Sequence, residues 1–500
     1  MVEGFCTDVY RGVVTGRFRV GTSNAPNAVS CFLALRVGRS IKLSAIPMLA
    51  LLINNGIAMD LRVRRLSNLR SLADAESAGG DMLELVRELY PICRSITGDG
   101  LRQSLAKVGE LLPLTIHEVA TGTEVFDWTV PKEWNIRDAY IKDAASRRVV
   151  DFQQCNLHAV NYSAPVNARM SLKELRPHLH VLPEHPDWIP YRTSYYAESW
   201  GFCLSQRQLE NLSDGEYEVV IDSTLQDGSL SYGECVLPGQ IDDEFLISVH
   251  ICHPSLANDN LSGVAVATAL AKVLASTSHR YTYRFLFVPG TIGPIAWLSR
   301  NQAAVQRVKH GLVLACVGDR GGINYKRSRR LSADIDRAVE HVLRSKGAPF
   351  QVQDFSPYGY DERQYCSPGF NLPVGSFRRT PHGEYAEYHT SADNLEFVSA
   401  AHLADSLTTL LEVVDLIESD LRFINLSPMG EPQLGRRGLI GSVGGKAAKS
   451  DQLALLWVLN LSDGNTSILD IAERSRLSFD QLRGAIEALT ACGLLERMPE

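Results

Sequence analysis

Between residue 81 and about residue 238, the hydrophobic pattern changes from helical spacing to short β-type runs. Residues 82–90 and 101–112 place apolar side chains at helical spacing, and Gly98-Asp99-Gly100 separates the two patterns. From about residue 118 the apolar runs become short and are separated by turn-forming residues. These runs are found at 124–130, 139–141, 178–182, 217–221 and 230–236. The pattern predicts an inserted all-β domain over residues 118–238.

Residues 239–425 alternate between apolar runs and helical patterns. The runs that predict strands are 245–249, 283–288, 311–317 and 371–374. The helical patterns lie at 261–276, 295–301, 331–346 and 403–420. Near-continuous apolar runs indicate strands that are covered on both faces, as in doubly wound folds. Together with residues 81–117, this region is predicted to form an α/β domain on a doubly wound mixed sheet.

Residues 446–500 form a third predicted unit with the outline of a winged helix-turn-helix. Helical patterns at 452–459, 467–474 and 478–492 precede a short apolar run that can form a wing strand. The third helix, in the recognition position, carries one Arg, one Asp and one Glu between residues 478 and 490. Because DNA phosphates require a basic face, this helix does not favour nucleic-acid binding. An adaptor or dimerisation role, with a protein partner or a second copy of the chain, is the favoured interpretation.

Residues 1–80 differ from the rest in charge. The first seventy residues hold ten Lys and Arg against three Asp and Glu, and their helical or strand periodicity is weak. We interpret this segment as a basic, poorly ordered extension. A targeting or partner-binding arm is the alternative.

The remaining composition is that of an ordinary globular chain. Of its 500 residues 45% are hydrophobic and 21% are charged, and the net charge of −7 gives no whole-chain reason for nucleic-acid or membrane binding. The longest apolar candidate, residues 43–58, contains Pro47 and Asn54-Asn55 and is shorter than the ~18–20 residues of a membrane span. The ten cysteines form no Cys-x-x-Cys pair, which favours a reducing compartment. We therefore expect a soluble, cytoplasmic protein.

Potential metal ligands follow the predicted strands. The first strand runs into His250, His253 and Asp259, the third into Asp319, and the segment after the fourth into His389. Ligands of open α/β sheets bind beyond the carboxyl ends of the strands, and imidazole with carboxylate suits Zn²⁺. Singly, Asp259 is also a good N-cap, Asp319 a turn residue and His389 an ordinary surface histidine. On one continuous strand His250 and His253 would face opposite sides, so which of them is a ligand stays open.

Four longer stretches carry a family resemblance, at 250–263, 316–319, 361–375 and 384–394. They resemble the zinc-dependent aminopeptidases with a co-catalytic two-metal site. The likeness is closer to bacterial aminopeptidase-like proteins with an inserted β domain and a C-terminal winged helix, and it covers residues 81–500. It implies a histidine of the His250/His253 pair as first ligand, Asp259 as bridging carboxylate, and Asp319 and His389 as further ligands.

The chain departs from this family at Gly290 and Thr291. The aminopeptidase pattern has two adjacent glutamates there, the first a general base and the second a metal ligand. Glycine cannot accept a proton, and a neutral threonine hydroxyl is a poor Zn²⁺ ligand. We expect one zinc, with weak or no binding of a second, and slow hydrolysis unless Glu362, Glu384 or Glu387 supplies the base. A Gly290→Glu variant is expected to gain activity.

The resulting prediction is a metal-dependent, aminopeptidase-like hydrolase that cleaves an amide or peptide bond, with activity weakened or lost through Gly290. Arg363 and Tyr388 are the predicted substrate-binding residues, because a guanidinium suits a substrate carboxylate; a structural salt bridge of Arg363 is the alternative. The substrate is a peptide or an amide-bearing small molecule such as a sugar or metabolite. The alternatives are an inactive binding protein that uses the vestigial zinc pocket and a regulator that acts through the winged helix.

Overall fold

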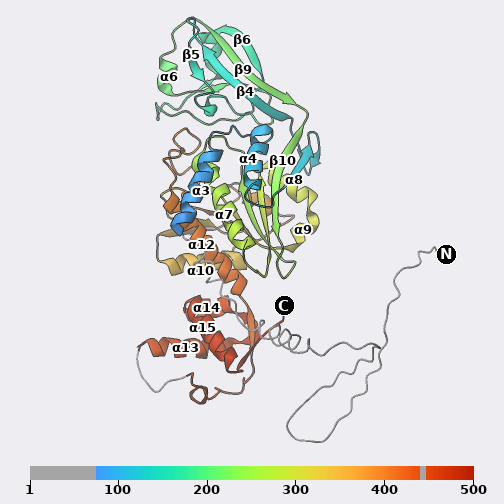
Figure 1. Cartoon of the computed structure of the whole chain (residues 1–500), viewed down its shortest axis with the longest axis vertical. Coiled ribbons are helices and arrows are strands. Elements are labelled where there is room, and N and C mark those ends of the chain that lie inside the picture. Colours follow the sequence, from blue (N-terminus) through green and yellow to red (C-terminus); the bar gives the residue numbers. More distant parts are fainter. Residues whose placement is uncertain (1–74, 440–445, 500) are drawn as a thin grey trace, which may run out of the picture. The chain divides into compact units, whose positions relative to one another are not determined.

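The computed structural model describes residues 75–439 and 446–499. The basic extension predicted for residues 1–80 therefore lies outside the described residues, except for its last part. Helices α3 (Ala75–Leu89) and α4 (Asp99–Gly109) occupy the two segments predicted to be helical before the β-rich region (Figure 1).

The central element is an eight-stranded mixed sheet. In spatial order its strands are β1 (Thr115–Ala120), β10 (Ser229–Leu237), β12 (Thr282–Val288), β11 (Glu244–His250), β13 (Val308–Leu314), β16 (Val374–Arg378), β14 (Ile323–Lys326) and β15 (Phe350–Gln353). Strand β11 pairs in parallel with both β12 and β13, and β13 pairs in parallel with β16. The α/β architecture predicted from the apolar runs is confirmed. The fourth strand, however, begins only at Val374, because Asn371 adopts a left-handed turn conformation with φ 48°.

Hydrophobic cores lie on both faces of this sheet. Successive residues of β11 contribute to different cores, Phe245 and Ile247 to one and Leu246 to the other. The first core includes residues of α3, α4, α7 (Gly263–Ala275), α10 (Asp334–Lys346) and α12 (Ala400–Ser419), and it continues into the C-terminal helices. The second core includes residues of α8 (Ile292–Arg300) and α9 (Gln302–Arg307). This double cover explains why the strand sequences are apolar almost without interruption.

The inserted domain has its own four-stranded antiparallel sheet and its own core. The strand order is β5 (Arg148–Asp151), β4 (Glu133–Lys142), β9 (Glu216–Gln226), β6 (Val166–Ser171) (Figure 1). The shorter elements are β2 (Glu124–Val125), β3 (Trp128–Thr129), α5 (Leu172–Leu175), β7 (Leu179–His180), β8 (Phe202–Cys203) and α6 (Gln206–Glu210). The run at 230–236, predicted to belong to the insertion, instead forms β10 of the central sheet. An antiparallel edge pair such as β1–β10 has the same short β texture as an insertion, so sequence alone did not separate them.

The C-terminal unit has the predicted winged-helix outline. Helices α13 (Lys446–Leu461), α14 (Ile468–Ser475) and α15 (Phe479–Ala491) accompany a small sheet of β18 (Asp463–Ser467), β17 (Arg422–Asn425) and β19 (Leu495–Arg497). Ser467 and Ser478 cap α14 and α15 by accepting backbone N–H groups with their hydroxyls.

The winged helix is tied to the α/β domain by ion pairs. Arg337 of α10 lies 2.6 Å from Asp470 and 2.7 Å from Glu473 of α14. Arg483, the arginine of α15, is buried and lies 2.7 Å from Asp415 of α12. The arginine of the helix in the recognition position therefore forms an ion pair within the chain.

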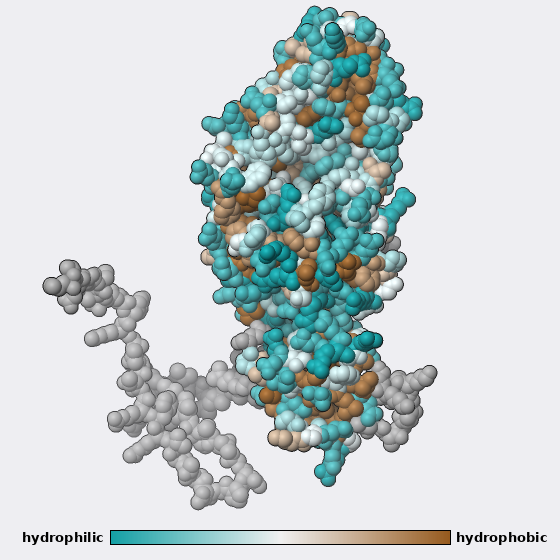
Figure 2. Space-filling model, turned by 180° about the vertical axis from the view of Figure 1, so that it is seen from behind, coloured by the Kyte–Doolittle hydropathy of each residue, from teal (hydrophilic) through white to brown (hydrophobic). Residues whose placement is uncertain are grey.

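On the face shown in Figure 2, hydrophobic residues form separate patches among hydrophilic ones, as is normal for a folded chain. None of the described helices is both long and apolar enough to cross a membrane.

Candidate metal centre

Three histidines surround the buried carboxylate of Asp259. His250, the last residue of β11, has its Nε2 2.8 Å from Asp259 Oδ1. His389 Nε2 lies 3.0 Å from Asp259 Oδ2, and His253 Nε2 lies 3.9 Å from the same oxygen. The structure thus brings together four of the five predicted metal ligands at the carboxyl end of the sheet.

Both members of the histidine pair face this cluster. Strand β11 ends at His250, so His253 is not bound to the alternating directions of a continuous strand. The potential ligand atoms of His250, His253 and Asp259 all lie within 4.8 Å of one another. Burial lowers the pKa of His253 well below its ordinary value, which favours the neutral imidazole that binds metals. Burial opposes ionisation of Asp259, but the facing imidazoles outweigh it and hold its pKa well below the usual range.

Asp393 fixes the backbone that carries Asp259. Its carboxylate accepts the N–H groups of Asn258 at 2.6 Å and of Asp259 at 2.9 Å, and its carbonyl accepts the N–H of Ala257 at 3.0 Å. Burial raises the pKa of Asp393 to about 8 against the lowering effect of these hydrogen bonds. Asp393 follows His389 by four residues, so it joins the segment of the distal histidine to the Asp259 segment. Nothing in the sequence distinguished this aspartate from an ordinary loop carboxylate.

Asp319, the fifth predicted ligand, has other partners. Its Oδ1 accepts from Thr380 Oγ1 at 2.6 Å and from the Gly321 N–H at 2.7 Å. Its Oδ2 accepts from Asn258 Nδ2 at 3.0 Å and from the Thr380 N–H at 3.2 Å. Asp319 therefore supports Asn258, the neighbour of Asp259, and its role as a ligand stays a prediction.

The space beside Gly290 is filled by Tyr360. A Cβ atom built on Gly290 would lie 2.5 Å from the Tyr360 hydroxyl oxygen and 2.7 Å from Cζ, which is closer than real side-chain contacts. The Tyr360 ring also packs on His250, with 4.1 Å between ring centroids. A phenol thus occupies the place, next to a candidate ligand, where the resemblance expects a glutamate. The sequence shows that position 290 lacks the glutamate. It does not show that Tyr360, seventy residues further along the chain, fills the space.

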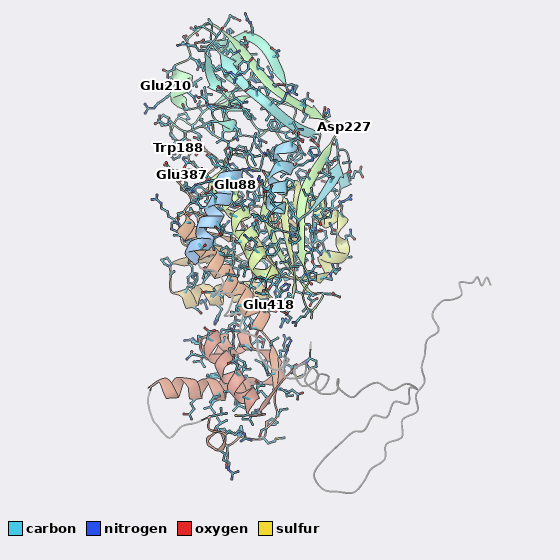
Figure 3. The ribbon with its side chains drawn as sticks, viewed as in Figure 1. Glu88, Trp188, Glu210, Asp227, Glu387 and Glu418 are labelled. Carbon is cyan, nitrogen blue, oxygen red and sulfur yellow. The ribbon has the colours of Figure 1, made fainter. Side chains whose placement is uncertain are left out.

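The three glutamates predicted as general bases have different surroundings. Glu362 is buried in an ion pair with buried Lys326 and accepts the Tyr360 N–H at 3.1 Å. Glu384 is exposed and Glu387 half-buried, in the segment that leads to His389. In Figure 3, Glu387 is drawn near Trp188, consistent with hydrogen bonds that join the two neighbouring segments. Glu384 and Glu387 are therefore less buried than Glu362.

The two predicted substrate-binding residues differ in their exposure to solvent. Arg363 is exposed on the short helix α11 (Glu362–Tyr365). Asp361, its buried neighbour, has no hydrogen-bond partner for either carboxylate oxygen among the described residues. Tyr388 is half-buried and stacks on His389, with 4.0 Å between centroids and 13° between ring planes. Tyr388 therefore borders the cluster directly.

The inserted domain also contributes to the cluster. The backbone N–H of Tyr191 donates to the His389 carbonyl at 2.7 Å, and its ring lies 5.2 Å from that of His253 and 5.0 Å from that of His389. Next to it, the Ser391 N–H donates to the Ile189 carbonyl at 2.8 Å, and the Ile189 N–H donates to the Ser391 hydroxyl at 3.0 Å. The insertion thus forms one wall of the candidate metal centre.

The donor set is suited to zinc. Imidazole nitrogens and a carboxylate are common Zn²⁺ ligands, and a catalytic site typically uses three protein ligands. His250, His253 and Asp259 are buried and mutually close, with His389 on the far oxygen of Asp259.

Comparisons with known proteins agree with this description. Residues 83–420 match a family model described as a domain of unknown function, DUF4910, and residues 421–497 match a winged helix-turn-helix model. A Clostridium acetobutylicum protein is 50% identical over 426 residues, which cover 85% of this chain and 98% of that protein. It is provisionally named a polysaccharide biosynthesis protein with an aminopeptidase-like domain.

Two solved structures extend the comparison to three dimensions. A crystallised C. acetobutylicum chain, provisionally named a peptidase, is 49% identical with a TM-score of 0.82, covering 86% of this chain and 99% of that one. A zinc aminopeptidase from Bacillus subtilis is 13% identical with a TM-score of 0.52, covering 68% and 94%. At that identity the second likeness shows the fold alone.

Proposed function

Because the chain belongs to the DUF4910 family and has an aminopeptidase-like fold with a C-terminal winged helix, we propose that it is a zinc-dependent hydrolase of amide bonds. The observation that carries the proposal is the grouping of His250, His253 and His389 around Asp259. These residues come from segments up to 139 positions apart and meet at the carboxyl end of a doubly wound sheet.

His250, His253 and Asp259 would hold the zinc, with His389 as a further donor. When bound there, zinc lowers the pKa of a water molecule toward ~7 and polarises the substrate carbonyl. Asp393 keeps the Asp259 backbone in place, and the rings of Tyr191 and Tyr388 pack against the His389 ring. The chain's own residues would thus orient the donors.

A single zinc is favoured over a pair. Gly290 and Thr291 replace the base and the ligand of the two-metal pattern, and Tyr360 fills the space beside Gly290. Asp319 already accepts four hydrogen bonds. Both observations leave few groups for a second cation.

The proton of the attacking water needs an acceptor, and Glu384 or Glu387 is the proposed one. Either carboxylate would take that proton and pass it to the leaving amine, a role worth typically ~10²–10⁴-fold in rate. If neither reaches the site, the chain is a binding protein that uses the same pocket. The absence of a carboxylate at Gly290 favours this second candidate function.

The substrate is proposed to be an amide-bearing sugar or metabolite, or a peptide. The polysaccharide role in the name of the C. acetobutylicum relative supports the sugar. A cytoplasmic location and a protein or homo-oligomeric contact through the winged helix are further proposals. The use of Arg483 inside the chain weighs against a DNA-binding regulator.

Metal analysis of the purified full chain tests this proposal first. We expect about one zinc per chain, and loss of that zinc in a His253→Ala variant but not in a His341→Ala variant of α10. Hydrolysis of an aminoacyl p-nitroanilide and release of acetate from N-acetylated sugars would then be assayed with the metal present. Two tightly held zincs would refute the single site, and no zinc in the intact chain would refute the metal-dependent function.

A further inference from the structure

A cleft separate from the metal centre lies between the α/β domain and the inserted domain. Its volume is about 710 Å³, within the ~300–1,000 Å³ range of small-molecule sites. The α/β domain lines it with the segment that follows α3, the start of α4 and Ser255, and the inserted domain lines it with parts of β4 and the segment after β5. Neither His250 nor Asp259 belongs to this lining.

Carboxamide side chains dominate the polar lining. Five are present: Gln103, Asn135, Gln153, Gln154 and Asn156. Gln103 of α4 and Gln154 of the inserted domain are exposed and make no side-chain hydrogen bond within the described residues. The Asn156 Oδ1 atom is buried without a partner there. A buried amide oxygen without a donor is costly, so this atom indicates a ligand or water that donates to it.

The charges of the lining are already compensated. Arg137 lies 2.6 Å from Asp222, and Asp99 lies 3.2 Å from Arg102. The cleft therefore offers no unpaired charge to a phosphate, a carboxylate or a peptide terminus. Carboxamides both donate and accept hydrogen bonds, which matches the hydroxyl groups of a neutral sugar.

The cleft borders the loop that carries the metal ligands. Ser255, two residues after His253, lines the cleft, and its hydroxyl donates to the Tyr90 carbonyl at 2.9 Å. Tyr90 lines the cleft as well. A ligand bound here would therefore contact the loop that carries His253.

We propose that this cleft is a binding site for a neutral saccharide. Hydroxyl groups of the sugar hydrogen-bond to Gln103 on one wall, to Gln154 on the other, and to Asn156 Oδ1 between them. The ligand thereby bridges the α/β domain and the inserted domain. The proposal goes beyond the hydrolase function and stands whether or not the metal centre cleaves amides.

The test uses the full chain on an array of neutral glycans, followed by calorimetry with the strongest ligand. We expect Gln103→Ala and Gln154→Ala each to weaken binding about three- to tenfold, the range of one lost neutral hydrogen bond. A Gln306→Ala variant of α9, which changes an exposed glutamine outside the cleft, should bind like the parent. Zinc content should be unchanged in all three variants, which separates this site from the metal centre.

Three results would overturn the saccharide site. The first is that the chain binds no neutral glycan at millimolar concentration. The second is that the chain binds a glycan but neither cleft variant weakens this binding. The third is that the chain binds peptides of an unrelated library and binds no glycan. Because both glutamine side chains are exposed and without partners, the variants should fold normally, which melting curves would check.

Discussion

A glutamate placed at Gly290 should not increase hydrolytic activity unless Tyr360 is also replaced by a smaller residue. The sequence alone predicts that Gly290→Glu gains activity. In the structure, however, the new Cβ would lie 2.5 Å from the Tyr360 hydroxyl oxygen, so the phenol must move by about 1 Å to reach ordinary contact distance. Overpacking of this kind costs about 1–3 kcal/mol. We therefore expect the single variant to melt at a lower temperature and to hydrolyse no faster than the parent.

A double variant, Gly290→Glu with Tyr360→Ala, should behave differently. It gives the carboxylate the space of the phenol beside His250, where it would accept the proton of the attacking water. We expect kcat/KM to rise about 10²–10⁴-fold over Tyr360→Ala alone, the usual contribution of a general base. The matched control is Gly290→Gln with Tyr360→Ala, which has the same volume but no base and should show no such gain.

The assay is hydrolysis of aminoacyl p-nitroanilides, with zinc content and melting temperature measured on every variant. A single Gly290→Glu variant that is both active and as stable as the parent would show that Tyr360 is no obstacle. Equal rates for the Glu and Gln double variants would refute the assignment of position 290 to the base.

Three further predictions concern the metal centre and the link to the insertion. Replacing His253 by Ala should abolish zinc binding measured by competition with a chelator; unchanged affinity would remove it from the ligand set. Asp393→Asn should weaken zinc binding about 10–100-fold, the usual cost of losing a group that supports a metal ligand. The reason is that the new amide NH₂ group repels one of the two backbone N–H groups that the carboxylate accepts. A lower melting temperature with unchanged zinc affinity would show that the role of Asp393 is purely structural. Arg102 lowers the pKa of Glu133 to about 2 through their hydrogen bonds, so this pair's stabilising effect is complete above about pH 4.5 and is lost as pH falls toward 2. A Glu133→Gln variant should therefore lose less stability than the parent across that acid range, and identical acid-unfolding curves would contradict the assignment.

The parts of the structure that follow from local patterns were predictable from the sequence. The apolar runs of β11, β12 and β13 identify strands covered on two faces, and the Ser467 and Ser478 caps identify helix starts. The residues that gather at the carboxyl ends of the strands also follow from topology.

Other features depend on contacts between distant segments and have no local signal. Tyr360 beside Gly290, Tyr191 against His389 and Asp393 under Asp259 are each brought together only by the tertiary fold. Asp319 also has contacts that the sequence did not indicate. Its carboxylate accepts hydrogen bonds from Thr380 and Asn258, and its role as a metal ligand stays a prediction.

The backbone hydrogen bond from Tyr191 to the His389 carbonyl would couple a metal bound at the His389 imidazole to the inserted domain. A metal that orders His389 would then stabilise residues 189–191, and a change that loosens residues 189–191 would weaken metal binding by the same factor. Removal of the metal with a chelator should therefore make proteolysis of the inserted domain faster. The protease sensitivity of the inserted domain would then report whether a metal is bound at the cluster.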